Sequence, residues 1–244
     1  MTSSVPLASI RIVLSRTSHP GNIGATARAM KTMGLSQLWL VAPLSYPDPV
    51  ALARASGADD ILTQARVVPT LAEALQGTRM AAALTARPRE WSTPPASARQ
   101  AAPELIDIAR DGEIALVFGN ETSGLTNEEL ALCARPVTIP TNSGYSSLNL
   151  AAAVQLLCYE LRLAAAQDPA PRSAGKSQLP ASFEEIEGFY QHLEKAMTRS
   201  GFYDPANPRR LMPRIRRLFG RTHLERDEVN ILRGILNALE RKLD

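Results

Sequence analysis

The sequence predicts an α/β protein with a mostly parallel sheet, followed by a small all-helical unit. Between residues 10 and about 167, short apolar runs alternate with helical patterns. The apolar runs lack clean alternation with polar residues, which indicates strands buried on both faces, as in a parallel sheet covered by helices. Beyond residue 180 the apolar residues follow a helical period alone.

The elements of the α/β part follow in chain order. Buried strands are predicted at 10–14, 38–41, 80–84, 114–118 and 137–139. Helices are predicted at 23–33, 71–76, 103–110, 127–133 and 148–166. Residues 87–103 include Pro88, Pro94 and Pro95 among Ser, Thr and Arg, which predicts a long loop. Long loops often carry functional residues.

Length and composition restrict the class of protein. The chain has 244 residues, of which 45% are hydrophobic, enough for one large domain, or one domain with a small appendage, around a real core. No apolar run approaches the roughly 20 residues that span a membrane, and the first residues lack the basic start and long apolar centre of a signal peptide. We therefore expect a soluble, cytoplasmic protein.

Cysteine and histidine usage argues against a disulfide or a metal site. Cys133 and Cys158 form no CxxC motif and are expected to be packed thiols in a reducing compartment. The histidines, His19, His192 and His223, are scattered without the spacing of metal ligands. No bound metal is expected.

Three polar segments each adjoin a predicted strand, at 15–28, 118–125 and 138–150. Because parallel strands end at one edge of a sheet, these loops can converge into one crevice. The first is glycine-rich but carries neither the GxGxxG nor the GxxxxGK[ST] signature, so a dinucleotide-binding or nucleotide-hydrolysing site is unsupported.

The third segment leads into an alanine-rich helix. Ser146 or Ser147 is a plausible N-cap, and Asn149 is then a polar side chain in the first turn, where burial without partners would cost about 1–3 kcal/mol. The unpaired N–H groups of such a helix start suit a carboxylate or phosphate. An ordinary capped core helix is the alternative interpretation of this stretch.

The C-terminal part follows a break at 167–180, which predicts a linker. Ser182 and Glu185 form a capping-box pattern that opens the first of three amphipathic helices. Six arginines and no acid lie between residues 209 and 221. Four of them fall on one helical face, which favours binding of an RNA phosphate backbone over an ordinary solvated surface: Arg210, Arg214, Arg217 and Arg221.

Three stretches together resemble a known family. SHPGNIGATARAMKTMG, LVFGNETSGLTNEEL and TIPTNSGYSSLNLAAAVQ are similar, in order and position, to the three motifs of the SpoU-type methyltransferases of the SPOUT superfamily. The RRLF and NILRGIL segments resemble the helical extension of those members that methylate the 2′-oxygen of tRNA nucleotide 32, a cytidine or uridine. The resemblance implies a methyltransferase domain at 1–166, a linker at 167–180 and a tRNA-binding extension at 181–244.

The resemblance also implies a C-terminal trefoil knot in the α/β domain, a homodimer and S-adenosylmethionine as cofactor. The implied catalytic residues are Arg28, Asn22, Glu121, Ser147 and Asn149. The implied cofactor contacts are Leu84, Thr85, Ala86, Gly119, Ile139, Ser146, Ser147 and Leu148. Residues 83–87 read Ala-Leu-Thr-Ala-Arg where relatives have Gly-Thr-Ser-Ala-Arg, so backbone contacts are expected there rather than side-chain contacts.

The implied reaction needs no metal, because methyl transfer from a sulfonium to oxygen extinguishes a positive charge and depends mainly on positioning in a dry site. Arginine holds its proton in proteins. We therefore expect Arg28 to orient the 2′-hydroxyl and a neighbouring phosphate rather than to act as the base. Without the resemblance, Arg28 would be interpreted as a surface arginine. Two alternatives remain: methylation of another RNA such as rRNA, and a noncatalytic RNA-binding protein.

Overall fold

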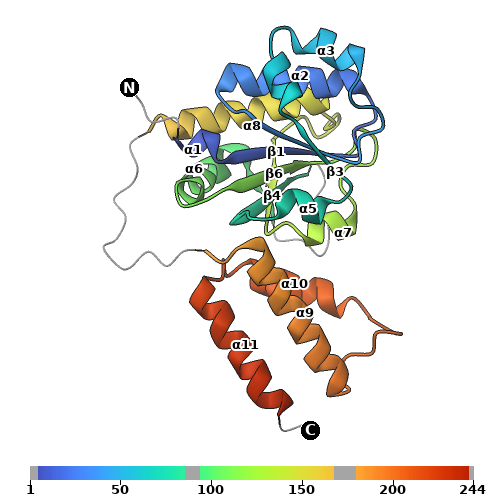
Figure 1. Ribbon diagram of the computed structural model, residues 1–244, viewed down its shortest axis with the longest axis vertical. Coiled ribbons are helices and arrows are strands. Elements are labelled where there is room, and N and C mark those ends of the chain that lie inside the picture. The colour runs from blue at the N-terminus through green and yellow to red at the C-terminus, as the bar shows by residue number, and fades with distance from the viewer. Residues whose placement is uncertain (1–4, 86–93, 168–179, 242–244) are drawn as a thin grey trace.

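The structure is a computed structural model that describes residues 5–85, 94–167 and 180–241. In these ranges a seven-stranded sheet lies between two layers of helices, and three further helices form a separate unit below it (Figure 1). No helix in the described ranges is long and apolar enough to cross a membrane.

The sheet has the order β3-β2-β1-β6-β4-β7-β5, and its strand pairings are parallel. Its strands are β1 (Ile10–Ser15), β2 (Gln37–Val41), β3 (Arg66–Val68), β4 (Met80–Leu84), β5 (Ala96–Ser97), β6 (Ile114–Phe118) and β7 (Arg135–Thr138). The five predicted strands are confirmed; β4 and β6 have the predicted ends, and the ends of β1, β2 and β7 are shifted by one or two residues. The two missed strands, β3 and β5, are short edge strands with no buried residue, and therefore lack an apolar run.

Helices cover both faces of the sheet. They are α1 (Val5–Ala8), α2 (Pro20–Met33), α3 (Pro49–Ala55), α4 (Asp59–Thr63), α5 (Leu71–Leu75), α6 (Ala98–Ala109), α7 (Asn127–Ala131) and α8 (Leu150–Ala165). The core between the sheet and the layer of α2, α6 and α8 includes Ile12, Met30, Leu105, Phe118 and Leu157. The opposite face packs against α5 and the segment around α7.

Three helix starts differ from the prediction, and the first is that of α2, which begins at Pro20 rather than at residue 23. The capping box of Ser97 and Gln100 opens α6 at residue 98, so the predicted start at Pro103 was wrong and residues 98–103 are not loop. The N-cap of α8 is Asn149, rather than Ser146 or Ser147. The Asn149 side chain accepts hydrogen bonds from the backbone N–H groups of Ala151 at 3.0 Å and Ala152 at 3.3 Å. Asn149 is exposed, so the expected burial cost does not arise.

The C-terminal unit consists of α9 (Phe183–Arg199), α10 (Leu211–Gly220) and α11 (Arg226–Glu240) around its own apolar cluster. The predicted capping box of Ser182 and Glu185 is confirmed. This helical unit is attached to the start of β4 by three hydrogen bonds. Phe183 N–H donates to Thr78 O at 2.9 Å, Gly77 N–H to the Glu184 carboxylate at 2.6 Å, and Arg79 to Pro180 O at 2.9 Å. The domain boundaries stay a prediction because residues 168–179 lie outside the described ranges.

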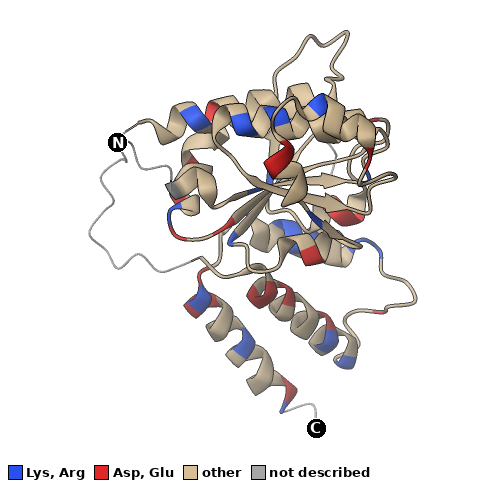
Figure 2. Ribbon diagram, turned by 45° about the horizontal axis from the view of Figure 1, so that its top comes forward, with Lys and Arg blue, Asp and Glu red and all other residues tan. Residues whose placement is uncertain are grey.

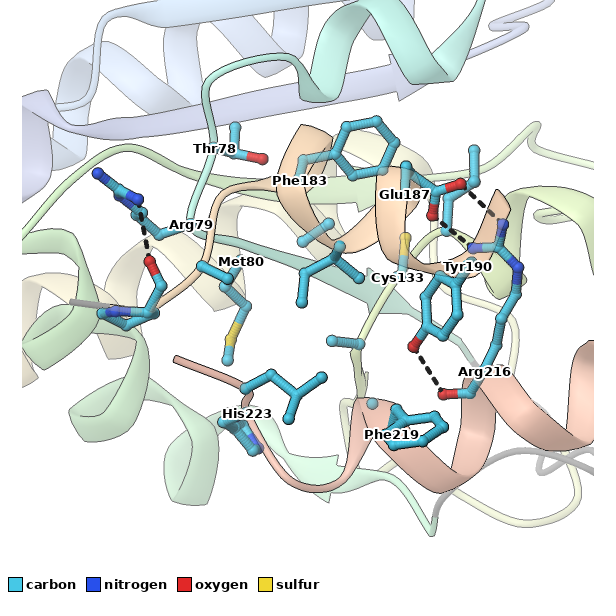
Figure 3. A pocket seen from close by; sticks show the side chains of 18 of the residues that line it. Thr78, Arg79, Met80, Cys133, Phe183, Glu187, Tyr190, Arg216, Phe219 and His223 are labelled. Carbon is cyan, nitrogen blue, oxygen red and sulfur yellow. Dashed lines mark hydrogen bonds and ion pairs between the residues drawn. The ribbon is translucent and has the colours of Figure 1, made fainter. Parts of the chain in front are cut away.

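A cavity of about 290 Å³ lies where the helical unit meets the α/β part (Figure 3). Its lining is mostly apolar, and its buried polar groups are paired. Arg216 binds both oxygens of Glu187, one of them at 2.7 Å, and Tyr190 donates to the backbone oxygen of Arg216 at 3.4 Å. These contacts connect α9 to α10. Arg216, one of the six clustered arginines, is therefore a packing residue rather than part of an RNA-binding face.

Candidate active site

A crevice of about 210 Å³ opens beyond the carboxyl ends of β4, β6 and β7. Of the eight predicted cofactor residues, the seven in the described ranges line it: Leu84, Thr85, Gly119, Ile139, Ser146, Ser147 and Leu148. The eighth, Ala86, lies outside those ranges. The structure thus brings together residues from three segments far apart in sequence, while their roles toward a cofactor stay predictions.

The turn after β6 forms one wall of the crevice. A Cβ on Gly119 would lie 2.2 Å from the Gly124 carbonyl carbon, so the two backbone segments approach too closely for any other residue. Asn120 closes the turn by accepting from Thr122 N–H at 2.9 Å and Ser123 N–H at 3.2 Å. Its amide donates to Arg16 O at 2.8 Å, which ties this wall to the loop after β1.

Glu121 is the most highly connected side chain of this turn. It accepts from Ser18 N–H at 2.9 Å, Ser18 Oγ at 2.8 Å, His19 N–H at 3.3 Å and the Asn22 amide at 2.8 Å. Burial opposes ionisation, but the hydrogen bonds from Ser18 and Asn22 outweigh it and lower the pKa of Glu121 to about 2. The carboxylate is therefore ionised at neutral pH and holds the loop after β1 against the turn after β6.

Asn22 and Asn149 extend this network to the third segment. Because the Asn149 oxygen caps α8, its amide nitrogen is left to donate, and it does so to Asn22 Oδ1 at 3.0 Å. The Asn22 amide nitrogen in turn donates to Glu121. This Glu121 network, Glu121–Asn22–Asn149, joins all three polar segments, so a shift in one loop must move the others.

Ser18 and His19 were missed from the sequence. His19 is the N-cap of α2, and its Nδ1 accepts from Gly21 N–H at 3.0 Å, while Ser18 supplies two of the donors to Glu121. Pro20 at the first helical position was the available signal, because proline there often follows a capping residue.

Arg28 does not join this group. It is exposed on α2, six residues or about 9 Å beyond Asn22, and the described residues that line the crevice do not include it. Helices α2 and α8 run side by side in one direction, because Asn22 bonds Asn149 at one end and Arg162 donates to Met33 O at the other. Arg28 therefore lies level with the middle of α8.

The outward face of α8 is apolar. Leu156, Tyr159 and Leu163 follow at helical spacing and are 42%, 45% and 43% exposed. This stripe is exposed in the described part of the chain, on the helix that packs beside the helix of Arg28.

The predicted RNA-binding arginines surround α10. Arg210 and Arg221 flank its two ends as N-cap and C-cap, and Arg214 and Arg217 lie within it. All but the half-buried Arg217 are exposed. Elsewhere the helical unit carries mixed charge: α9 begins acidic and ends basic (Figure 2). The described ranges contain no group of three or more His, Cys, Asp or Glu that could hold a metal ion.

A parallel α/β sheet with a crevice at its carboxyl edge, walled by a glycine turn and a helix start, defines the class of α/β enzymes that bind a small cofactor at this edge. Two family profiles match the chain: "SpoU rRNA Methylase family" over residues 9–159 and "tRNA methyltransferase TrmJ, C-terminal domain" over residues 184–244. The chain belongs to the SpoU methylase family.

Its relatives match nearly the full chain. It is 50% identical over 241 residues to the tRNA (cytidine/uridine/adenosine-2′-O-)-methyltransferase TrmJ of Pseudomonas aeruginosa, covering 95% of this chain and 94% of that protein. It is 46% identical to the tRNA (cytidine/uridine-2′-O-)-methyltransferase TrmJ of Photorhabdus laumondii, covering 96% and 98%. The crystal structure of TrmJ from Z. mobilis ZM4 superimposes with a TM-score of 0.82 at 38% identity, covering 94% and 98%.

Proposed function

We propose that the protein transfers a methyl group from S-adenosylmethionine to the 2′-hydroxyl of tRNA nucleotide 32, a cytidine or uridine, in the cytoplasm. The observation that carries the proposal is the Glu121 network, which connects three loops around one crevice. It occurs in a chain that is 50% identical to a tRNA 2′-O-methyltransferase over nearly its whole length. The family resemblance supplies the number of the nucleotide.

The crevice fits the proposed cofactor. Leu84, Ile139 and Leu148 offer apolar surface for a flat base. Bound S-adenosylmethionine would supply an electrophilic methyl group on a sulfonium. The trefoil knot, which the family implies around this crevice, is part of the proposal.

Different side chains position the loops, the nucleotide and the 2′-hydroxyl. The Glu121 network fixes the loops, and Ser147 at the mouth of the crevice contacts the nucleotide. A carboxyl with a pKa near 2 is too weak a base to take the ribose proton, so Glu121 acts through the loop that it holds. Arg28 orients the 2′-hydroxyl and its neighbouring phosphate, and the proton leaves to another acceptor because the guanidinium keeps its own.

The site is complete only in a homodimer, in this proposal. The exposed stripe of Leu156, Tyr159 and Leu163 suits burial against a second copy of the chain, and Arg28 is exposed on the neighbouring helix α2. Pairing through this face would bring Arg28 of one subunit toward the crevice of the other.

Replacing both Leu156 and Leu163 by Asp is expected to separate the subunits, because four negative charges would be buried in the interface of the dimer. Light scattering should give 26.4 kDa for the variant and twice that mass for the wild type, with methyl transfer lost in the variant. Leu52→Asp on α3, a somewhat more exposed leucine away from the stripe, is the matched control. A wild-type mass of 26.4 kDa would refute the dimer.

The arginines around α10 are proposed to contact tRNA phosphates. Arg217→Ala combined with Arg221→Ala is expected to weaken tRNA binding and to reduce the slope of log affinity against log salt by about one to two. Calorimetry should show cofactor binding unchanged. Arg233→Ala, an exposed arginine on α11, serves as the control. An unchanged salt slope in the double variant would remove these residues from the interface.

The reaction is tested by transfer of labelled methyl from S-adenosylmethionine to a tRNA transcript and, separately, to ribosomal RNA. The proposal expects label in tRNA alone. Because the matching family profile is named for rRNA methylases, rRNA is the specific competing substrate. Label in rRNA alone would contradict the proposal, and cofactor binding without transfer to either RNA would indicate the noncatalytic alternative.

A further inference from the structure

The loop that joins α9 to α10, residues 200–210, displays an aromatic ring that the helical core does not use. Phe202 is 71% exposed, whereas its neighbour Tyr203 is 8% exposed. Gly201 ends α9 in the left-handed region with a φ of 74°, a geometry in which a following apolar residue usually packs back onto the helix. Here Tyr203 takes that place, with its N–H donating to Met197 O at 3.1 Å. Phe202 is left pointing outward.

The loop is held by its own hydrogen bonds. Asp204 accepts from Ala206 N–H at 2.9 Å through its side chain and from Asn207 N–H at 3.0 Å through its backbone. Leu211 N–H donates to Pro208 O at 2.9 Å. The ring is thus presented by an ordered turn, so a partner that covers it need not order the loop first.

The same loop ends in two arginines with left-handed backbones. Arg209 and Arg210 have φ values of 39° and 60°, which long side chains rarely adopt and which tend to persist at functional positions. From there the arginines continue along α10 toward the α/β part. The loop projects to one side of the helical unit, away from α11 (Figure 1).

We propose that Phe202 is a stacking platform for an unpaired base of the RNA substrate, whose phosphates the arginines around α10 contact. An exposed aromatic ring in the same loop as two arginines suits single-stranded nucleotides, because a base can stack on the ring while neighbouring phosphates contact the charges. The base faces of a duplex are covered by stacking, so Phe202 would add no affinity for a duplex. The inference rests on the proposed function and adds a contact outside the crevice.

The test is equilibrium binding of labelled tRNA to the full-length chain at fixed salt. Phe202→Ala and Phe202→Leu are expected to weaken binding about tenfold, whereas Phe202→Trp stays within about twofold of the wild type. The salt slope and the rate at saturating tRNA should not change, because no phosphate contact and no crevice residue is altered. Ile231→Ala, an exposed apolar residue on α11, is the control.

Four outcomes would overturn the proposal. If Phe202→Leu bound tRNA as tightly as Phe202→Trp, the contact would be apolar packing rather than stacking, as expected for a protein partner. An equal loss of affinity for an RNA duplex would show that no unpaired base is involved. A wild type that binds and methylates tRNA while Phe202→Ala has unchanged affinity would reject this contact alone, whereas a wild type that does neither rejects the proposed function as well.

Discussion

Glu121→Gln is expected to lower kcat for methyl transfer by about two orders of magnitude, because displacement of positioned groups by about 1 Å has effects of that size. Four donors converge on the two oxygens of Glu121. Glutamine replaces one oxygen with a donor, which must face either Ser18 or Asn22, so the loop after β1 has to move. Single-turnover kinetics with saturating tRNA and cofactor would measure the effect.

Graded variants make this prediction specific. Ser18→Ala removes the hydroxyl donor but leaves the backbone N–H, so a loss of only a few fold is expected. Glu73→Gln, at the cap of a distant helix, should leave the rate unchanged. If Glu121→Gln were as active as the wild type, the Glu121 network would have no role in positioning the reacting groups.

The lowered pKa of Glu121 makes the stability of the folded protein depend on pH. A carboxyl whose pKa falls from 4.5 to about 2 on folding stabilises the native state above pH 4.5, and that stability is lost as the pH falls from there toward 2. Between pH 6 and 9 the group does not titrate. The rate profile in that range should therefore be the same in shape for wild type and Glu121→Gln, differing only in height.

Arg28→Ala is expected to lower kcat by about 10²–10³-fold with cofactor affinity unchanged, because Arg28 lies outside the crevice lining yet is proposed to orient the reacting hydroxyl. Arg28→Lys should recover part of the rate with the same pH profile. A steep pH dependence that Arg28→Lys abolishes would instead identify the arginine as the base.

Mixed dimers distinguish the two possible positions of Arg28. A heterodimer of an Arg28→Ala subunit and a Glu121→Gln subunit contains one intact site if Arg28 serves the partner's crevice, and none if it serves its own. We expect mixing and re-equilibration to restore about half of the wild-type activity per heterodimer. No recovery, with heterodimers verified by mass, would place Arg28 in its own subunit's site.

The parallel core of the fold was predictable because β1 and β6 are apolar runs buried along their whole length. The edge strand β3 and the helices α3 and α4 were not predictable, because they are too short to show a period. The N-cap of α8 was misplaced because two serines and Asn149 are all good caps, and only the partners of Asn149 decide among them.

The site was predictable to a similar degree. The order of strands and loops indicates that three polar segments meet, but hydrogen bonding between Glu121, Asn22 and Asn149 depends on tertiary distances that no spacing reveals. In the sequence Arg216 cannot be distinguished from the neighbouring arginines. In the structure it forms a hydrogen bond with Glu187 and lies over the ring of Tyr190, both on α9. Arg28 is exposed and lies outside the crevice lining, so its predicted role does not follow from the described residues of one chain alone.

The central claim is 2′-oxygen methylation of one tRNA nucleotide. The most direct measurement compares transfer of labelled methyl to a tRNA transcript with transfer to the same tRNA carrying deoxyribose at nucleotide 32. The proposal predicts label only in the ribose version, because the deoxyribose lacks the accepting oxygen. Equal label in both tRNAs would contradict it.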